Sequence, residues 1–266
     1  MTAVLMAAGR GRRMQGSDRA VLVSPAQQHA ATHGLKVLMP VGREGRPLLD
    51  FALSRLRQAG LRDVVIVASS DHAALDAHLS ARPPAGLEVR IAVQPKPDGT
   101  ASALVAAAPQ VRGDRCLVVN GDNLYPVPAM RELLALDDAG LAAFTRRSLE
   151  HDSGFSAARI AAFARVDADR DGWLVSLDEK PAIATLTDES VVSMNLWCVD
   201  RAILAACAEV PRSARGEREL PDAVMVAVRR GARVRVVPVT GAVLDVTYAH
   251  DVATVSRALD ASEVLS

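Results

Sequence analysis

The sequence has 266 residues, half of them apolar, and its formal net charge at pH 7 is zero. Such a chain is long enough to bury a core, as one large α/β domain or two small ones, and its neutrality excludes a general attraction to nucleic acid or to an anionic membrane. We therefore expect neither kind of partner, and any anion site must come from a local cluster of cations.

The chain begins with an apolar run, Val4–Met6, and a loop of small and basic residues, Ala7–Met14. Gly9 and Gly11 allow backbone angles closed to other residues, so consecutive backbone N–H groups can turn towards an anion. Positive charge in the loop comes from Arg10, Arg12 and Arg13. A strand followed by such a loop predicts a polyphosphate site, although a tight connection has the same composition. A dinucleotide-binding turn needs a third glycine where Met14 stands, which makes hydride transfer a minor alternative.

Residues 15–35 show no clear strand or helix period. A long connection beside a phosphate loop serves either as a mobile lid or as a surface insertion, and the sequence leaves both open. His29 and His33 are four residues apart and would face together on a helical turn. Because no third ligand lies nearby, we expect solvated histidines rather than a metal site.

Strands and helices then alternate through the first half of the chain. The predicted strands are the apolar runs Val64–Val67, Val89–Val93 and Cys116–Val119. The predicted helices are Leu48–Gly60, Ala73–Leu79 and one capped by Thr100, with Ala101, Leu104, Val105 and Ala108 on one face. This alternation predicts a doubly wound, mostly parallel α/β sheet flanked by helices, whose ligands bind outside the carboxyl ends of the strands. The loop Ala7–Met14 and Asp122 follow strands in this way.

From about residue 141 strands dominate the pattern. The predicted strands are Ala142–Thr145, Arg159–Val166, Trp173–Leu177 and Val191–Val199, and the predicted helices are Pro221–Arg229 and Asp251–Leu259. Nothing marks a linker, so we expect a single domain over residues 1–266. Its nucleotide-binding half is expected at 1–140, and the pocket of the second substrate at 141–266.

Short motifs follow one another along these elements: L-x-A-A-G-x-G-x-R-M from Leu5, K-x-L-x-P from Lys36, Q-x-x-x-D-G-T from Gln94, N-G-D-N from Asn120 and E-K-P from Glu179. Together they resemble the sugar-1-phosphate nucleotidyltransferases, or nucleoside-diphosphate-sugar pyrophosphorylases. The pattern is most similar to that of glucose-1-phosphate thymidylyl- and uridylyltransferases. The resemblance implies a Rossmann-like nucleotidyltransferase fold. It also implies an enzyme that joins a nucleoside triphosphate and a sugar 1-phosphate into an NDP-sugar, releasing pyrophosphate with the help of Mg²⁺.

The resemblance implies roles for particular residues. Arg13, Lys36 and Asp122 would be catalytic, the two cations neutralising phosphate charge and the aspartate holding magnesium. Asp245 would be the second magnesium ligand. The nucleotide would contact Ala7, Ala8, Gly9, Arg10, Gly11, Arg12, Arg13, Gln94, Gly99 and Thr100. Gln94, whose amide both donates and accepts, would read the base and favour UTP or dTTP, although an amide can also pair with a purine edge.

On the side of the sugar phosphate, the resemblance assigns contacts to Asn123, Ala164, Glu179, Lys180 and Asn195. Glu179 would bind a sugar hydroxyl and Lys180 the sugar phosphate, yet E-K-P is also an ordinary exit from a strand. Ala164 stands where the family has a glycine against the sugar, so its methyl group narrows or reshapes that contact. Residues 216–223 resemble a family stretch that positions a helix in the sugar-binding half. The identity of the sugar stays open.

The sequence leaves two alternatives to this function: a cytidylyl- or guanylyltransferase acting on a non-sugar phosphate, and a catalytically silent nucleotide-binding regulator. The three cysteines lack the paired spacing of a zinc site and indicate packed, reduced thiols. Because neither a signal peptide nor a membrane span is recognised, we expect a cytoplasmic enzyme. The state of assembly is left open, a homo-oligomer included.

Overall fold

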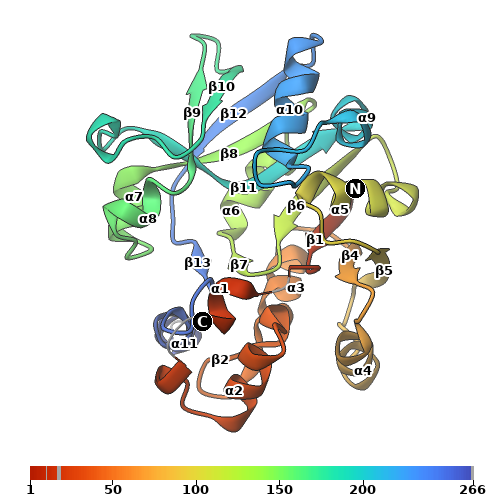
Figure 1. Ribbon diagram of the computed structural model, residues 1–266, viewed down its shortest axis with the longest axis vertical. Coiled ribbons are helices and arrows are strands. Elements are labelled where there is room, and N and C mark those ends of the chain that lie inside the picture. The colour runs from red at the N-terminus through yellow and green to blue at the C-terminus, as the bar shows by residue number, and fades with distance from the viewer. Residues whose placement is uncertain (10, 17–18, 265–266) are drawn as a thin grey trace.

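A mixed sheet forms the centre of the computed structural model (Figure 1). The structure describes residues 1–9, 11–16 and 19–264, and within them the main sheet has nine strands. Four parallel neighbours follow the order β6-β1-β4-β5, with bounds Arg115–Asn120, Thr2–Met6, Asp63–Ser69 and Glu88–Gln94. Their apolar runs do not alternate with polar residues, because helices cover both faces of a parallel sheet. The prediction of a doubly wound sheet is confirmed for this half.

The second half of the chain extends the same sheet beyond β6. Its strands are β8 (Ala139–Thr145), β9 (Ala164–Ala168), β10 (Leu174–Asp178), β11 (Val191–Asp200) and β12 (Val234–Val239). β11 pairs antiparallel with β6, β8 and β9, whereas β12 is parallel to β8. The sheet is therefore mixed, and the pair β6–β11 joins the strands of both halves.

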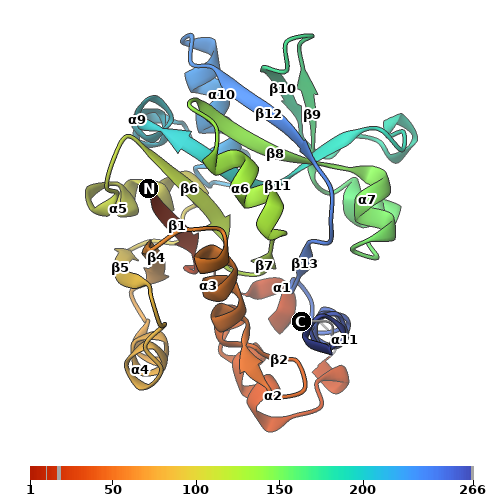
Figure 2. The ribbon, with the colours of Figure 1, turned by 180° about the vertical axis from the view of Figure 1, so that it is seen from behind.

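Helices cover both faces of the sheet (Figures 1 and 2). One face carries α3 (Leu48–Gln58) and α6 (Val127–Leu134), and the other carries α5 (Thr100–Ala107), α9 (Arg201–Glu209) and α10 (Leu220–Arg229). Side chains alternate along β1 accordingly: Ala3 and Leu5 belong to the first core and Val4 to the second. The connection from β4 to β5 is α4 (Ala73–Ala81). None of the helices in the described ranges is long and apolar enough to span a bilayer.

The cysteines lie in these two cores. Cys116, Cys198 and Cys207 are free and buried. Burial raises the pKa of each thiol, that of Cys207 to about 12. The prediction that these side chains serve packing is confirmed.

Regular structure occurs between residues 15 and 35, where no clear period was found. α1 spans Arg12–Gln15, α2 spans Pro25–Thr32, and residues 17 and 18 lie outside the described ranges. The Ser24 hydroxyl accepts a hydrogen bond from the backbone N–H of Gln27 (3.2 Å), and the Gln27 side-chain oxygen accepts one from the backbone N–H of Ser24 (3.4 Å). This capping box, with a proline at the first helical position, starts α2. A helix this short shows little apolar period, so its caps are the stronger signal.

The predicted strand Arg159–Val166 is wrong in its first half. Ala157–Ile160 forms α8 instead, capped by the Ser156 hydroxyl, which accepts from the backbone N–H of Arg159 at 3.2 Å. Ile160 buries its side chain from this helical turn, and β9 begins only at Ala164. The preceding helix, α7, spans Arg146–His151. Arg159 therefore lies on α8, a helix that lines the site described below.

Candidate active site

The candidate site lies at the carboxyl ends of the parallel strands, where the two-stranded sheet of β7 (Asn123–Leu124) and β13 (Leu244–Asp245) joins two distant segments (Figure 1). β7 follows the turn after β6 and pairs antiparallel with β13. Asp245 lies opposite Asn123 in this register, and the backbone N–H of Val246 donates to the Asp122 carbonyl at 2.9 Å. This pairing brings Asp122 and Asp245, the two predicted metal ligands, to one side of the site.

The two carboxylates differ in their surroundings. Asp122 is partly exposed and accepts a hydrogen bond from Lys36 Nζ in an ion pair, with Lys36 held on the short helix η2 (Lys36–Leu38). Asp245 is only 6% exposed, and burial, followed by the charge of Asp122, raises its pKa from 3.8 to about 6. Two neighbouring carboxylates repel each other when both are ionised, and a divalent cation removes that repulsion. The donor set therefore fits a hard cation such as Mg²⁺, which takes one or two carboxylates together with phosphate oxygens and water.

An ion network that the sequence did not predict holds the Asp245 side chain. Arg159 Nη2 lies 3.2 Å from Asp245 Oδ2, and Arg159 Nη1 lies 2.6 Å from Asp251 Oδ1. Asp251, at the start of α11 (Asp251–Val264), also accepts from the backbone N–H groups of Thr247 (2.9 Å) and Tyr248 (2.7 Å). The Thr247 hydroxyl donates to Asp245 Oδ1 at 2.8 Å. These bonds fix the Asp245 side chain. In the sequence, the sign of this network was an aspartate, Asp251, at the start of a predicted helix.

The first cavity beside these aspartates, the large cavity, has a volume of about 760 Å³. All the predicted sugar-phosphate residues line it: Asn123, Ala164, Glu179, Lys180 and Asn195. Lys180 (φ 53°) and Asn195 (φ 59°) are the described non-glycine residues with positive φ. Such backbone strain persists where the surrounding structure enforces it, and it concentrates at binding sites. Burial, then the charge of Glu219, raises the pKa of Glu179.

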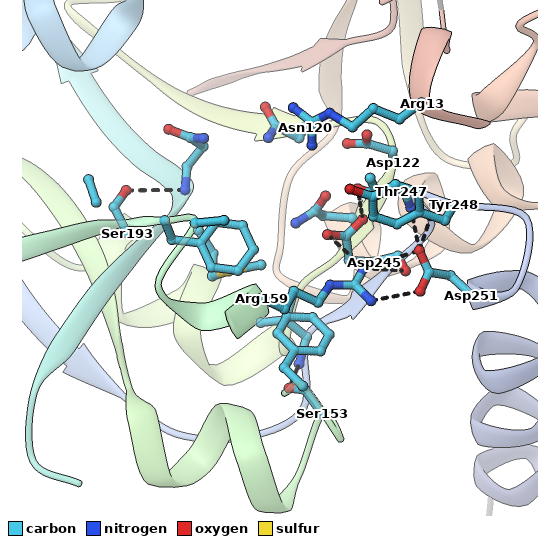
Figure 3. Close-up of a pocket in the computed structure, with 18 of the residues that line it drawn as sticks. Arg13, Asn120, Asp122, Ser153, Arg159, Ser193, Asp245, Thr247, Tyr248 and Asp251 are labelled. Atoms are coloured by element: carbon cyan, nitrogen blue, oxygen red, sulfur yellow. Dashed lines mark hydrogen bonds and ion pairs between the residues drawn. The ribbon is translucent and has the colours of Figure 1, made fainter. Parts of the chain in front are cut away.

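A second cavity, the loop cavity, has a volume of about 510 Å³ and lies along the N-terminal loop. It is lined by the predicted nucleotide residues of the described chain: Ala7, Ala8, Gly9, Gly11, Arg12, Arg13, Gln94, Gly99 and Thr100. Arg10, which was also predicted to bind nucleotide, lies outside the described residues. Arg13, Asn120 and Asp122, which are labelled on the wall of the large cavity in Figure 3, also line the loop cavity, so the two cavities meet at these side chains.

The turn after β5 is held from outside by the segment that precedes α10. The backbone N–H of Arg218 donates to the Asp98 carbonyl (2.7 Å), and the Arg218 carbonyl accepts from the backbone N–H of Ala101 (3.0 Å). A Cβ on Gly99 would lie 2.1 Å from the Arg218 oxygen, so only glycine fits there. Thr100 does not cap α5 as predicted, because its hydroxyl accepts from the backbone N–H of Leu220 at 2.8 Å.

Gln94 lies beneath this turn and is 4% exposed. Its amide Nε2 donates to the Gly99 carbonyl at 3.0 Å. That bond uses one of the two amide hydrogens and fixes the plane of the side chain. Gln94 is also one of the residues that line the loop cavity.

Comparisons with known proteins identify the family of the chain. Residues 31–264 match the profile of the nucleotidyl transferase family. A glucose-1-phosphate thymidylyltransferase of Mycolicibacterium smegmatis (strain ATCC 700084 / mc(2)155) is 29% identical over 239 residues, which cover 87% of this chain and 72% of that protein. The enzyme of the same name from Neisseria gonorrhoeae is 29% identical over 227 residues, covering 84% and 69%.

Solved structures show the same fold. A crystal structure of UDP-glucose pyrophosphorylase complexed with UDP-glucose aligns with a TM-score of 0.74 over 98% of each chain, at 14% identity. A putative glucose-1-phosphate thymidylyltransferase from Bacillus anthracis aligns with a TM-score of 0.71 over 98% of this chain and 95% of that one, at 22% identity. Since the family profile extends over most of the sequence, from the end of α2 to the end of α11, the chain belongs to the nucleotidyl transferase family.

Proposed function

We propose that this enzyme transfers a nucleotidyl group from a nucleoside triphosphate to a sugar 1-phosphate, giving an NDP-sugar and pyrophosphate. The observation that carries the proposal is the meeting of two cavities at Arg13 and Asp122. One cavity follows the glycine- and arginine-containing loop, and the other is lined by polar side chains on a strained backbone. A phosphate oxygen of the sugar phosphate attacks the α-phosphorus, and the bond from that phosphorus to the pyrophosphate oxygen breaks.

Every reacting group is an anion, so positioning and charge neutralisation are the tasks of the protein. Arg13 lines the junction of the cavities, where it offsets the charge that moves onto the leaving pyrophosphate. Lys36 holds its ammonium against Asp122 on the loop side and supplies a second cation there. Asp122 and Asp245 would hold Mg²⁺, which supplies charge neutralisation to the phosphate oxygens when bound.

On the sugar side, Lys180 would contact the phosphate and Glu179 a sugar hydroxyl. Asn123 and Asn195 offer amides that both donate and accept. The Ala164 methyl group lies on β9, which pairs with Ser193 of β11 at this position, so the methyl is fixed by the sheet. This placement supports a role for Ala164 in limiting which sugars enter.

We further propose that Gln94 reads the base and favours UTP or dTTP. With one amide hydrogen bound to Gly99, the oxygen can accept from the N3–H of uracil or thymine and the second hydrogen can donate to a ring carbonyl. Cytosine has no hydrogen on N3 and would leave part of this pattern unpaired. An unpaired buried polar group costs about 1–3 kcal/mol, which corresponds to roughly ten- to a hundredfold discrimination.

The test is a matrix of the common nucleoside triphosphates against a set of sugar 1-phosphates, with magnesium and with release of pyrophosphate as the readout. We expect turnover with UTP or dTTP and with a small group of sugar phosphates. Preference for a purine would refute the role of Gln94. Binding of nucleotide without pyrophosphate release across the whole matrix would refute the transferase function and favour a silent regulator.

A further inference from the structure

A third cavity, the outer cavity, shares no described lining residue with the large cavity and has a volume of about 750 Å³. Its floor is formed by the residues that follow β1, β4 and β5, and its outer wall by Arg12 and Gln15 of α1 and by His29 and His33. Arg12, Lys36 and Gln94 line both the outer cavity and the loop cavity. The outer cavity is therefore a continuation of the loop cavity.

The two histidines present a pair of rings to this cavity. Their ring centroids are 4.2 Å apart with an interplanar angle of 34°, and His33 Nδ1 lies 2.9 Å from the His29 carbonyl oxygen. Because a carbonyl oxygen only accepts, His33 Nδ1 carries the hydrogen in this contact. Histidine is the ordinary side chain that changes charge between about pH 5 and 8. Two protonated rings at this distance repel each other, and an anion between them removes the repulsion.

The other charged groups that face the cavity are mostly cations. α2 packs on α1, η2 and β2 (Pro40–Val41). Of the charged side chains on these elements, Arg12 and Lys36 line the outer cavity, whereas Arg13 does not, and Lys36 is ion-paired with Asp122. The opposite wall carries Asp71 and His72, and His72 lies 3.4 Å from Asp76. Among the described lining residues Asp71 is the single carboxylate. Positive charge on the histidines would therefore add to that of Arg12 in this cavity.

The direction of the reaction indicates which anion arrives there. In an in-line displacement the leaving oxygen departs on the side of phosphorus opposite to the attacking oxygen. The sugar phosphate attacks from the large cavity, so the pyrophosphate departs along the loop cavity, past Arg12 and Lys36 and towards the outer cavity. We propose that the outer cavity binds the leaving inorganic pyrophosphate through Arg12, His29 and His33, and that protonation of the two histidines strengthens this binding. The inference rests on the proposed function, because the identity of the anion follows from the reaction.

Direct binding of inorganic pyrophosphate, with magnesium, tests the proposal by calorimetry at pH 6.0 and pH 8.0. The proteins are wild type, the double variant H29Q/H33Q and the control variant H151Q, which changes an exposed histidine at the end of α7 that does not line the outer cavity. Pyrophosphate itself changes charge over this pH range, so the readout is the ratio of the Kd of each variant to that of wild type. We expect a ratio of about three- to tenfold for the double variant at pH 6.0, close to one at pH 8.0, and close to one for H151Q at both. The single variants H29Q and H33Q should fall between.

The proposal would be overturned if the Kd ratio of the double variant were equal at the two pH values. It would also be overturned if H151Q raised the Kd at pH 6.0 as much as the double variant does. The reverse reaction, in which pyrophosphate is a substrate, gives a second measurement: its KM for pyrophosphate should show the same dependence on pH and variant, with little change in kcat. The two proposals fail separately. If the enzyme forms NDP-sugar but the double variant binds pyrophosphate with the Kd of wild type, the histidine site alone is overturned. If the Kd ratio is as expected but no NDP-sugar forms, the transferase function is overturned.

Discussion

Replacing Asp245 by asparagine should stabilise the metal-free protein at neutral pH, although it removes a proposed metal ligand. Burial and the charge of Asp122 raise the pKa of Asp245 in the folded state from 3.8 to about 6. A raised carboxyl pKa means that the folded protein favours the protonated form. Ionisation of Asp245 therefore costs folding free energy, and the cost grows as pH rises from about 4 to about 6 and stays constant above that.

The magnitude follows from the two pKa values. The difference between 3.8 and about 6 corresponds to about 3 kcal/mol at pH values where the folded carboxyl is ionised. Asparagine keeps an oxygen to accept from the Thr247 hydroxyl, and Arg159 keeps its bond to Asp251 (2.6 Å). Arg159 loses one of its two carboxylate partners, so we expect a net gain of about 1–3 kcal/mol for the variant. For a chain of this size this is about 2–10 °C in Tm.

The assay is thermal unfolding of wild type and Asp245→Asn in EDTA at pH 7.5 and pH 5.0, repeated at pH 7.5 with excess magnesium. At pH 5.0 the difference should shrink, because wild-type Asp245 is then largely protonated in the folded state. Magnesium should raise the Tm of wild type more than that of the variant. A matched control of opposite sign is Asp63→Asn: burial would raise the Asp63 pKa, but hydrogen bonds from Thr2 and Arg90 lower it, so this variant should be less stable than wild type at pH 7.5.

Two results would refute the reasoning. The first is an Asp245→Asn protein that is less stable than wild type in EDTA at pH 7.5. The second is a difference in stability that does not change between pH 7.5 and pH 5.0, since the effect would then not come from ionisation of this carboxyl.

Three further substitutions test the site and the turn beside it. Asp122→Asn should keep the fold and lose activity by about a hundredfold or more, because an amide lacks the charge needed at the metal, as measured by pyrophosphate release at saturating magnesium. Arg13→Ala should lower kcat more than it raises the KM for the sugar phosphate, because its charge is needed as pyrophosphate develops; steady-state kinetics measure this. Gly99→Ala should destabilise the fold by about 2–4 kcal/mol in chemical unfolding, because the new Cβ would meet the Arg218 carbonyl at 2.1 Å with φ at +117°.

Each of these predictions has an outcome that contradicts it. Activity of Asp122→Asn within a few-fold of wild type would contradict the proposed role of Asp122 as a metal ligand. For Arg13→Ala, an unchanged kcat with only a raised KM for the sugar phosphate would place its charge in substrate binding. The control for Gly99 is Gly60→Ala, which has a similar φ of +101° but no atom within 4 Å of the new Cβ. Equal losses in the two variants would mean that backbone strain, rather than contact with Arg218, is responsible.

Local chemistry made much of the first half of the chain predictable. The apolar runs at Val4–Met6 and Val64–Val67 fall within β1 and β4, because strands covered on both faces need no polar alternation. The N-terminal loop and the turn at Asn120–Asp122 follow their strands directly, so their place at the carboxyl edge was readable from the order of elements. The start of α2 was readable too, from the capping pair Ser24 and Gln27, but apolar periodicity is a weak signal in so short a helix.

Tertiary structure alone decided the contacts between distant segments. Pairing of β7 with β13 sets Asp245 beside Asp122, and α8 carries Arg159 under both Asp245 and Asp251. The hydroxyl of Thr100, expected to cap its own helix, accepts from Leu220 instead. An amino-acid sequence determines which residues favour a strand, a turn or a cap, since those preferences depend on neighbours along the chain. Which distant residues share a hydrogen bond or a buried charge depends on strand register and helix packing, and these are fixed only when the whole core is assembled.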